Sequence, residues 1–304
     1  MTAVAGPLQV RWLGRVHYPE ALAVQTSLFR HGTVNHLLLL EHHHVFTHGP
    51  GADLGLNVLV DPARVGAELV SVNRGGDVTY HGPGQLVGYP ILALPPKHGS
   101  SAGPADTMAH VRNVEQLMID ALGELGATDA GRLHGFPGVW LDPHGANPRK
   151  ICAIGVRVSR GRSMHGFALN VTTDMRYLRE YIVPCGIADR PVTSLAEEGI
   201  TASMADVVDV VTRLAGARWG TGAAQRQDVA WHERPEDLSA FSRSGGPGHA
   251  HERQRSEPVR LLGRLARAGV EESVPISTRK PEWLRPRVHH GVGVLALKKT
   301  IRDL

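Results

Sequence analysis

The stretch KICAIGVRVSRGRSMHGFALNV, residues 150–171, decides the fold class of this chain. Its two apolar halves, 150–158 and 164–171, contain β-branched and aromatic residues and are too short for ordinary helices. The polar residues between them, rich in arginine and glycine, are typical of a turn. We therefore predict two strands here.

The same patterns recur on both sides of this stretch. Apolar runs predict further strands at 8–13, 36–42, 68–74, 85–92 and 138–141. Helical spacing predicts helices at 19–31, 106–126 and 203–216. Asp106 is the expected N-cap of the second, and Ser203 with Asp206 resembles a capping box on the third. Short clusters of strands between isolated helices predict an α+β (α/β) fold, a mixed β-sheet with packed helices.

Composition limits the kinds of protein that this chain can be. Its 304 residues are enough for one substantial core, and 42% of them are hydrophobic. No run approaches the roughly 20 apolar residues of a membrane span, and the first fifteen residues show no secretory pattern. The chain has only two cysteines, so we expect reduced thiols and a cytoplasmic protein without membrane contact.

Charge divides the chain into a body and a tail. Residues 1–242 hold 20 Lys and Arg against 23 Asp and Glu, whereas residues 243–304 hold 13 against 6. We predict one folded domain over 1–241, a linker rich in Gly, Ser, His and Arg over 242–258, and a basic tail over 259–304. The tail is only patchily apolar and is not expected to form an independent domain. No nucleic-acid-binding motif appears, so we expect no nucleic-acid partner.

The segment RGGDVTYHGPGQL, Arg74 to Leu86, is the first candidate for chemistry. Adjacent glycines let a backbone approach a ligand closely, and Arg74 and His81 can donate hydrogen bonds to a carbonyl or an acid. The segment lacks the Gly-Lys-Ser/Thr ending of a phosphate loop. Spacing alone favours the simpler interpretation, a hairpin with a glycine-rich turn.

Cys185 is the second candidate, because it lies between a proline and a glycine at the end of an apolar run. It could be a buried filler, half of a disulfide, a metal ligand or a nucleophile. Lys150 begins the predicted strand 150–158, where strand alternation puts it on one face with Cys152 among apolar residues. Most strand lysines are solvated, but an ammonium near a thiol would lower the pKa of the thiol. Cys152 is expected to be an inert packing residue.

The histidine-rich segment LEHHHVFTHGP, residues 40–50, raises the question of a metal. His42 and His44 share a face of the predicted strand, and His48 follows four residues later. No cysteine or carboxylate joins them at zinc spacing. The pattern favours a histidine-lined pocket edge, and no metal site is predicted.

Four segments in order resemble the lipoyl(octanoyl) transferase family, the lipoate-protein ligase B type, over about residues 8–215. They are RGGDVTYHGPGQLVGYPI, RKICAIGVRVSRG, HGFALNV and IVPCGIADRPVTSL. The resemblance implies the fold of the biotin and lipoate ligases. It also implies transfer of an octanoyl or lipoyl group from acyl carrier protein to a lysine of lipoyl domains, without a cofactor. The implied acceptors are the lipoyl domains of 2-oxoacid dehydrogenase complexes and the glycine cleavage H protein.

The resemblance also implies roles for particular residues. Cys185 would carry the acyl thioester, and Lys150 would tune the pKa of that thiol and move protons. Three segments would line the acyl and substrate channel, where small side chains would leave a narrow slot. These residues are Arg74, Gly75, Gly76, Asp77, Val78, Thr79, Tyr80, His81, Ala153, Ile154, Gly155, Gly166, Phe167 and Ala168.

Two other readings of the body stay open at this point. An ATP-dependent lipoate-protein ligase on the same fold would need no nucleophilic thiol, and a non-catalytic acyl- or biotin-type binding protein would show no turnover. A basic rim for an acidic carrier protein is also expected, from Arg157, Arg160, Arg162, Arg176 and Arg179. Residues 276–304 resemble the N-terminal extension of lipoyl synthases, but without further cysteines this tail cannot bind their iron–sulfur clusters.

Overall fold

The structure is a computed structural model that describes residues 6–97, 103–184 and 190–228. Its largest feature is a mixed eight-stranded sheet in the order β11-β1-β2-β6-β10-β9-β8-β7, beside which β4-β3-β5 form a smaller sheet. The strands are β1 (Leu8–Val16), β2 (His36–His42), β3 (Val45–His48), β4 (Glu68–Ser71), β5 (Thr79–His81), β6 (Gln85–Ile91), β7 (Gly131–Leu133), β8 (Phe136–Leu141), β9 (Arg149–Ser159), β10 (Arg162–Asn170) and β11 (Ala224–Asp228).

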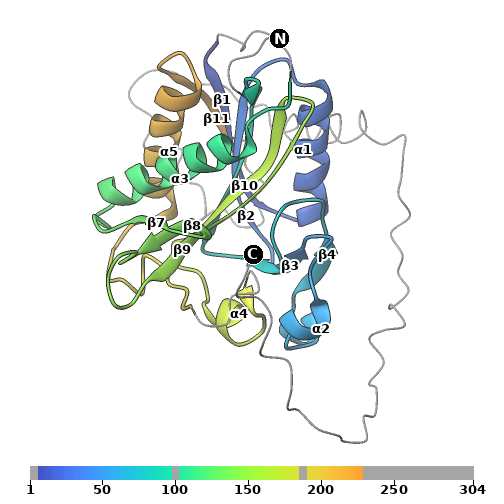
Figure 1. The fold of residues 1–304 in the computed structure, drawn as a ribbon, viewed down its shortest axis with the longest axis vertical. Helices are drawn as coiled ribbons and strands as arrows, with labels where there is room; N and C mark the ends of the chain where they lie inside the picture. Colours follow the sequence, from blue (N-terminus) through green and yellow to red (C-terminus); the bar gives the residue numbers. More distant parts are fainter. Residues whose placement is uncertain (1–5, 98–102, 185–189, 229–304) are drawn as a thin grey trace, which may run out of the picture. The chain divides into compact units, whose positions relative to one another are not determined.

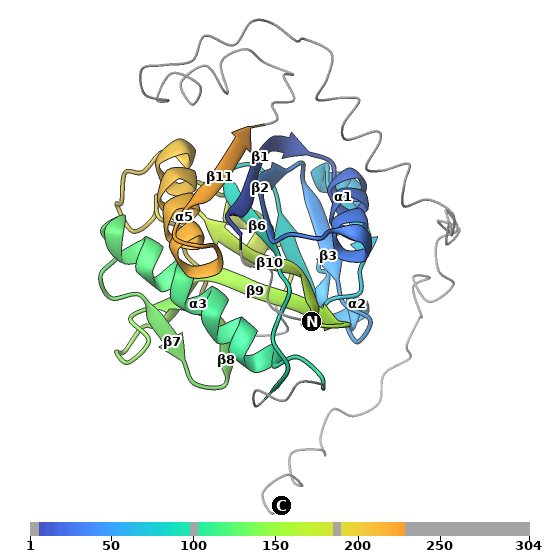
Figure 2. The ribbon, with the colours of Figure 1, turned by 90° about the horizontal axis from the view of Figure 1, so that it is seen from above.

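Helices cover both faces of the large sheet (Figures 1 and 2). Two helices, α3 (Thr107–Glu124) and α5 (Met204–Trp219), lie side by side on one face, and α1 (Tyr18–His31) lies on the other. Strand β2 explains why both faces are covered, because Leu37 and Leu39 pack under α3 and α5 while Leu38 and Leu40 pack toward α1. A strand buried on both faces reads as the continuous apolar run HLLLLEH.

The smaller sheet is completed by short elements and has its own apolar cluster. These elements are α2 (Leu54–Asn57), the 3-10 turn η1 (Pro62–Val65) and α4 (Arg176–Arg179). Phe46, Val78, Tyr80, Tyr177 and Ile182 pack together between them. The chain that approaches residue 185 is held here in two ways. Ile182 belongs to the cluster, and the Val183 N–H donates to the Asn57 carbonyl at the end of α2 at 2.9 Å.

The predicted fold class and most of the predicted elements are confirmed. Asp106 caps α3 by accepting from the Ala109 N–H, and Ser203 and Asp206 form the expected capping box on α5. Strands β3, β5, β7 and β11 were not predicted, because they are short, polar or glycine-flanked. The linker at 242–258 and the tail at 259–304 lie outside the described residues, so those boundaries stay predictions.

The glycine-rich segment is not the hairpin that spacing favours. Strand β5 pairs with β3 in the smaller sheet, whereas β6 pairs with β2 and β10 in the large one. The turn Gly82–Gly84 therefore carries the chain between two sheets. Gly84 has φ +78°, and its carbonyl accepts from the Val171 and Thr172 N–H groups.

A second correction concerns the start of β9. Val139 pairs with Cys152 but Trp140 pairs with Lys150, so Ile151 is an extra residue in the ladder. Ile151 and Cys152 consequently both enter the core under α3 and α5, and strict alternation fails between Lys150 and Cys152. Lys150 does not share a simple apolar face with Cys152, because this bulge re-aims its side chain.

Candidate active site

A cavity of about 50 Å³ opens where the glycine-rich segment lies against β9 and β10. Eleven of the fourteen channel residues suggested by the sequence line it, and they come from three separate segments of the chain. The lining comprises Tyr18, Arg74, Gly75, Gly76, Thr79, His81, Tyr89, Ala153, Ile154, Gly155, His165, Gly166, Phe167 and Ala168. The tertiary structure thus gathers the three motifs around one hollow.

Asp77, Val78 and Tyr80 are the three suggested residues that do not line this cavity. Strand alternation explains two of them, because Thr79 and His81 face the cavity while Val78 and Tyr80 enter the cluster of the smaller sheet. Asp77 instead accepts a hydrogen bond from the Asn57 side chain at 2.8 Å and caps its neighbour's N–H. Its role here is to hold the loop.

Gly155 is small because the glycine-rich loop comes close to β9. A Cβ at this position would lie 3.0 Å from the Gly75 carbonyl oxygen, and the Gly75 N–H donates to the Val156 carbonyl at 3.2 Å. Gly166 lies against backbone too, since a Cβ there would be 2.2 Å from the Gly88 oxygen. These glycines permit close approach of backbones. The close approach of these backbones narrows the cavity. The absence of side chains at the two glycines explains its shape only in part.

The cavity wall combines a fixed cation with neutral imidazoles. Arg74 donates to the Thr47 carbonyl at 2.8 Å and to the Gly75 carbonyl at 3.0 Å, which holds its guanidinium in the wall. Burial lowers the pKa of His81 well below the ordinary value, and the neighbouring His42 and Arg74 lower it further. His81 is therefore neutral at physiological pH.

Three cavity residues were missed from the sequence: Tyr18, Tyr89 and His165. Burial raises the pKa of Tyr18 to about 12 and lowers that of His165 to about 4, so both side chains are uncharged. His165 has φ +59°, an uncommon conformation for a strand residue, and its Nδ1 is buried without a partner. Only adjacency to the Gly166–Ala168 segment marked His165 in the sequence.

The histidines of residues 40–50 do not form the expected pocket edge, because none lines this cavity. His42 is fully buried, with Nδ1 2.8 Å from the Val16 carbonyl oxygen and Nε2 2.7 Å from the Tyr89 hydroxyl. His44 contacts the Tyr80 hydroxyl at 2.8 Å through Nδ1. His42 therefore holds the cavity residue Tyr89, whereas His44 holds Tyr80 in the smaller sheet.

Lys150 is buried, contrary to the usual solvated strand lysine. Only 7% of it is exposed, and its Nζ lies 4.9 Å from the centre of the Trp140 ring. Gly138 is required by the neighbouring backbone, since a Cβ there would lie 2.6 Å from the Cys152 carbonyl oxygen, whereas the Lys150 Cε would be at an ordinary contact distance of 3.5 Å. The buried Glu115 fixes Gly138 by accepting its N–H at 3.1 Å.

Lys150 is bound through its backbone to the residues that follow Cys185 in the sequence. Its N–H donates to the Pro191 carbonyl at 3.0 Å, and its carbonyl accepts from the Thr193 N–H at 2.9 Å. Cys185 itself lies outside the described residues. The described chain ends at Pro184 beside the smaller sheet and resumes at Arg190. Pro191 and Thr193, which follow, are hydrogen-bonded to Lys150.

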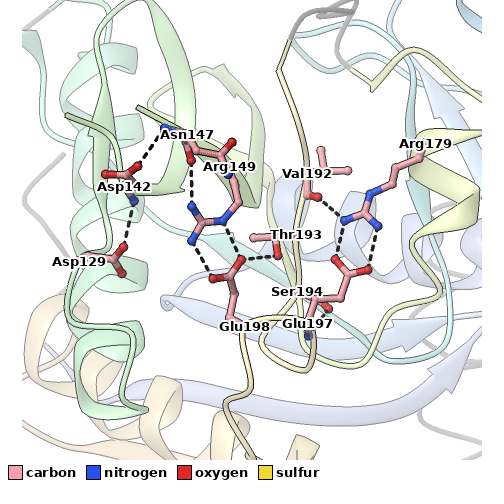
Figure 3. A network of polar contacts seen from close by, with 10 residues as sticks. All are labelled: Asp129, Asp142, Asn147, Arg149, Arg179, Val192, Thr193, Ser194, Glu197 and Glu198. Atoms are coloured by element: carbon pink, nitrogen blue, oxygen red, sulfur yellow. Dashed lines mark hydrogen bonds and ion pairs between the residues drawn. The ribbon is translucent and has the colours of Figure 1, made fainter. Parts of the chain in front are cut away.

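Two arginine–carboxylate pairs hold this returning segment (Figure 3). Arg149 makes a bidentate contact with Glu198 at 2.7 and 2.8 Å, and Glu198 also accepts from the Thr193 hydroxyl. Arg179 binds Glu197 at 2.8 Å and the Val192 carbonyl at 2.6 Å. Bidentate pairs of this kind fix geometry as well as charge, so residues 192–198 are firmly placed beside β9.

Cys152 is a buried packing residue, as its sequence context predicted. It is fully buried in the core of the large sheet. Burial raises the pKa of its thiol, and the nearby Glu115 adds to this, although the Ala168 backbone and Lys150 partly oppose it. A thiol held neutral in this way is a poor nucleophile.

The predicted basic rim is weakened by the contacts of its arginines. Arg176 pairs with Asp174 at 2.6 Å, and Arg179 is occupied with Glu197. Arg162 donates to the Gly32 and Val34 carbonyls of the α1–β2 connection. Carboxylates thus neutralise Arg176 and Arg179, and backbone carbonyls engage Arg162, which leaves Arg157 and Arg160 as the candidates for a docking charge.

Within 6–97, 103–184 and 190–228, no three His, Cys, Asp or Glu side chains are grouped so as to hold a metal ion. In the same ranges, no helix combines the length and apolar character needed to cross a membrane.

The fold is that of the lipoate-ligase-like class of proteins. The bipartite lipoate protein ligase of Thermoplasma acidophilum superposes with a TM-score of 0.60 over 78% of this chain and 91% of its own, at 17% identity. Lipoate-protein ligase A bound with ATP superposes with a TM-score of 0.56 at 18% identity, over 79% of this chain and 93% of its own. At these identities the similarity concerns the fold.

Sequence relationships place the chain within that class. Residues 17–214 match the lipoyl protein ligase A/B catalytic domain. The octanoyltransferase of Solibacter usitatus is 48% identical over 210 residues, 67% of this chain and 89% of its own length. That of Salinispora arenicola is 43% identical over 221 residues, 70% and 96% of the two chains. The chain belongs to the lipoyl protein ligase A/B catalytic domain family, and it is an acyltransferase.

Proposed function

We propose that this acyltransferase moves an octanoyl or lipoyl group from acyl carrier protein to a lysine of lipoyl domains through a thioester on Cys185. The relatives named octanoyltransferases support the acyl group, and the motif around Cys185 supports the nucleophile. One observation carries the proposal: buried Lys150 is hydrogen-bonded through its backbone to Pro191 and Thr193, shortly after Cys185 in the sequence. A cation and a thiol in one site favour nucleophilic catalysis.

The reaction consists of two balanced acyl transfers. The Cys185 thiolate attacks the carbonyl carbon of the donor thioester, the bond from that carbon to the carrier sulfur breaks, and the carrier thiol leaves with a proton. The ε-amine of the acceptor lysine then attacks the acyl-cysteine, forming an amide and releasing the Cys185 thiolate while the amine loses a proton. Lys150 donates and receives these protons. Both steps start from a thioester, so neither requires ATP.

The cavity suits the alkyl part of such a substrate. Ile154, Phe167 and Ala168 give it an apolar wall, while Arg74 and His81 place polar groups in the same hollow. An apolar cavity with few oriented polar groups is the usual design of a small-molecule site. The expected acceptors are the lipoyl domains of 2-oxoacid dehydrogenase complexes and the glycine cleavage H protein.

Intact-mass spectrometry tests this proposal. The purified chain is incubated with octanoyl-acyl carrier protein without ATP, and we expect one octanoyl adduct that maps to Cys185. The adduct should be lost in Cys185→Ser and retained in the matched control Cys152→Ala, because Cys152 is buried. Lys150→Ala should slow its formation. An adduct on Cys152, or transfer that requires ATP and free octanoate, would overturn the proposal in favour of another site or a ligase.

A further inference from the structure

An unbroken chain of buried polar groups connects the cavity to the start of β9. His81 Nδ1 lies 2.8 Å from Gln85 Oε1, and Gln85 Nε2 donates to Asn170 Oδ1 at 2.9 Å. Asn170 Nδ2 donates to the Thr193 carbonyl at 2.9 Å, and the Thr193 N–H donates to the Lys150 carbonyl at 2.9 Å. Every member is buried, so each hydrogen bond is shielded from water.

The direction of each side-chain hydrogen bond in this chain follows from the Thr193 carbonyl. The Thr193 carbonyl can only accept, so Asn170 must present its NH₂ group to it and its oxygen to Gln85. Gln85 must then donate through Nε2 and present its oxygen to His81. That oxygen can only accept, so the proton of neutral His81 is on Nδ1. The lone pair of the imidazole is therefore on Nε2.

The backbone holds this chain in place. Gln85 and Asn170 are direct partners in the antiparallel pair β6–β10, so their side chains meet across the ladder. The Gly82–Gly84 turn brings Gln85 back within reach of His81, and the Gly84 N–H donates to the Glu41 carboxylate. The tautomer of His81, which belongs to the smaller sheet, is therefore fixed by Gln85 and Asn170 of the large sheet.

We propose that Gln85 and Asn170 are positioning residues that fix His81 as the Nδ1–H tautomer, so that its Nε2 accepts a hydrogen bond from the primary amine that attacks the acyl group. This inference rests on the proposed function, because it concerns the amide-forming step. His81 lines the cavity and is neutral, and a neutral imidazole with a defined lone pair is a suitable acceptor for an N–H donor. An imidazole oriented through its other nitrogen is a common arrangement in enzyme sites.

The tautomer is measured directly, without reference to activity. The full chain is labelled with ¹⁵N-histidine, and long-range ¹H–¹⁵N correlations show which ring nitrogen carries the proton. The His81 signals are those absent from the His81→Gln variant. We expect the Nδ1–H tautomer in the unmodified protein, and the Nε2–H tautomer would overturn the inference.

The catalytic consequence is measured by separating the two transfer steps. Gln85→Leu removes both hydrogen bonds, so we expect aminolysis of the preformed octanoyl-enzyme by a lipoyl domain to fall roughly ten- to a hundredfold. Formation of the octanoyl-enzyme should change much less. Gln85→Glu keeps an acceptor for the His81 Nδ1–H and should recover part of the aminolysis rate. Gln116→Leu, a control on α3 where Gln116 hydrogen-bonds with Asp120 and Arg132, should leave both steps unchanged.

The outcomes separate this inference from the proposed function. Equal loss of both steps in Gln85→Leu would mean that Gln85 supports the fold, and the positioning role would be rejected. A lack of acylation in the unmodified protein would reject the proposed function, while the tautomer measurement would still decide the geometry of His81. Full aminolysis in Gln85→Leu would reject the role of the hydrogen-bond chain.

Discussion

Acidification should weaken this fold through His42, which is buried as a neutral ring. Both of its nitrogens are engaged, with the Val16 carbonyl at 2.8 Å and the Tyr89 hydroxyl at 2.7 Å. Burial lowers the pKa of His42 to about 4, although the hydrogen bond that its ring donates to the Val16 carbonyl opposes the shift. Protonation of His42 would place a positive charge on a ring that is buried away from solvent.

The sign and size of the effect follow from that shift. The unfolded chain binds a proton to His42 near its ordinary pKa of about 6.5, whereas the folded chain binds it only near 4. The stability is therefore complete above pH 6.5 and is lost as the pH falls from 6.5 toward 4. At about 1.4 kcal/mol for each pKa unit, His42 alone costs roughly 2 kcal/mol at pH 5.

Urea unfolding of the chain and of His42→Gln at pH 7 and pH 5 isolates this contribution. His42→Gln should be less stable at pH 7, because a glutamine cannot reproduce both hydrogen bonds. The stability gap should shrink by roughly 2 kcal/mol at pH 5, since glutamine does not titrate. The exposed His31→Gln is the matched control for removing a histidine at the surface. A gap for His42→Gln that is independent of pH would refute the reasoning.

Three further predictions concern packing and capping. Iodoacetamide should leave Cys152 unmodified in the folded protein and label it in urea; labelling in the folded state would contradict its full burial. Gly155→Val should raise the KM for the octanoyl donor several-fold by displacing the Gly75 loop. Gly123→Ala, at a position with open space around it, should leave the KM unchanged. Equal KM values for the two variants would argue against a close approach of the Gly75 loop to β9. Ser203→Ala should cost about 1 kcal/mol and lower Tm by roughly 2–4 °C, and Ser203→Thr should lose less; an unchanged Tm would exclude the capping box as a stabilising feature.

Local features of the sequence were enough to predict the long elements and the motifs. The helices behind Asp106 and Ser203 and the strands at 36–42 and 85–92 follow from periodicity and capping, which depend on neighbours within a few residues. The suggested channel residues came from a resemblance in ordered motifs. Eleven of them line one cavity because strands β9 and β10 are neighbours in the large sheet and the glycine-rich loop rests on β9.

The tertiary structure alone decided how these parts meet. Tyr18 and Tyr89 reach the cavity from α1 and β6, and no local pattern could announce a contact between such distant residues. The bulge at Ile151 re-aims Lys150 toward Trp140, because a one-residue shift in strand pairing depends on the partner strand. The tautomer of His81 likewise depends on the Thr193 carbonyl, a hundred and twelve positions further along the chain. The sequence by itself determined the helices and strands and the chemical groups available. Pairing across the sheets decided which of these groups face one another, because register and burial are properties of contacts between segments.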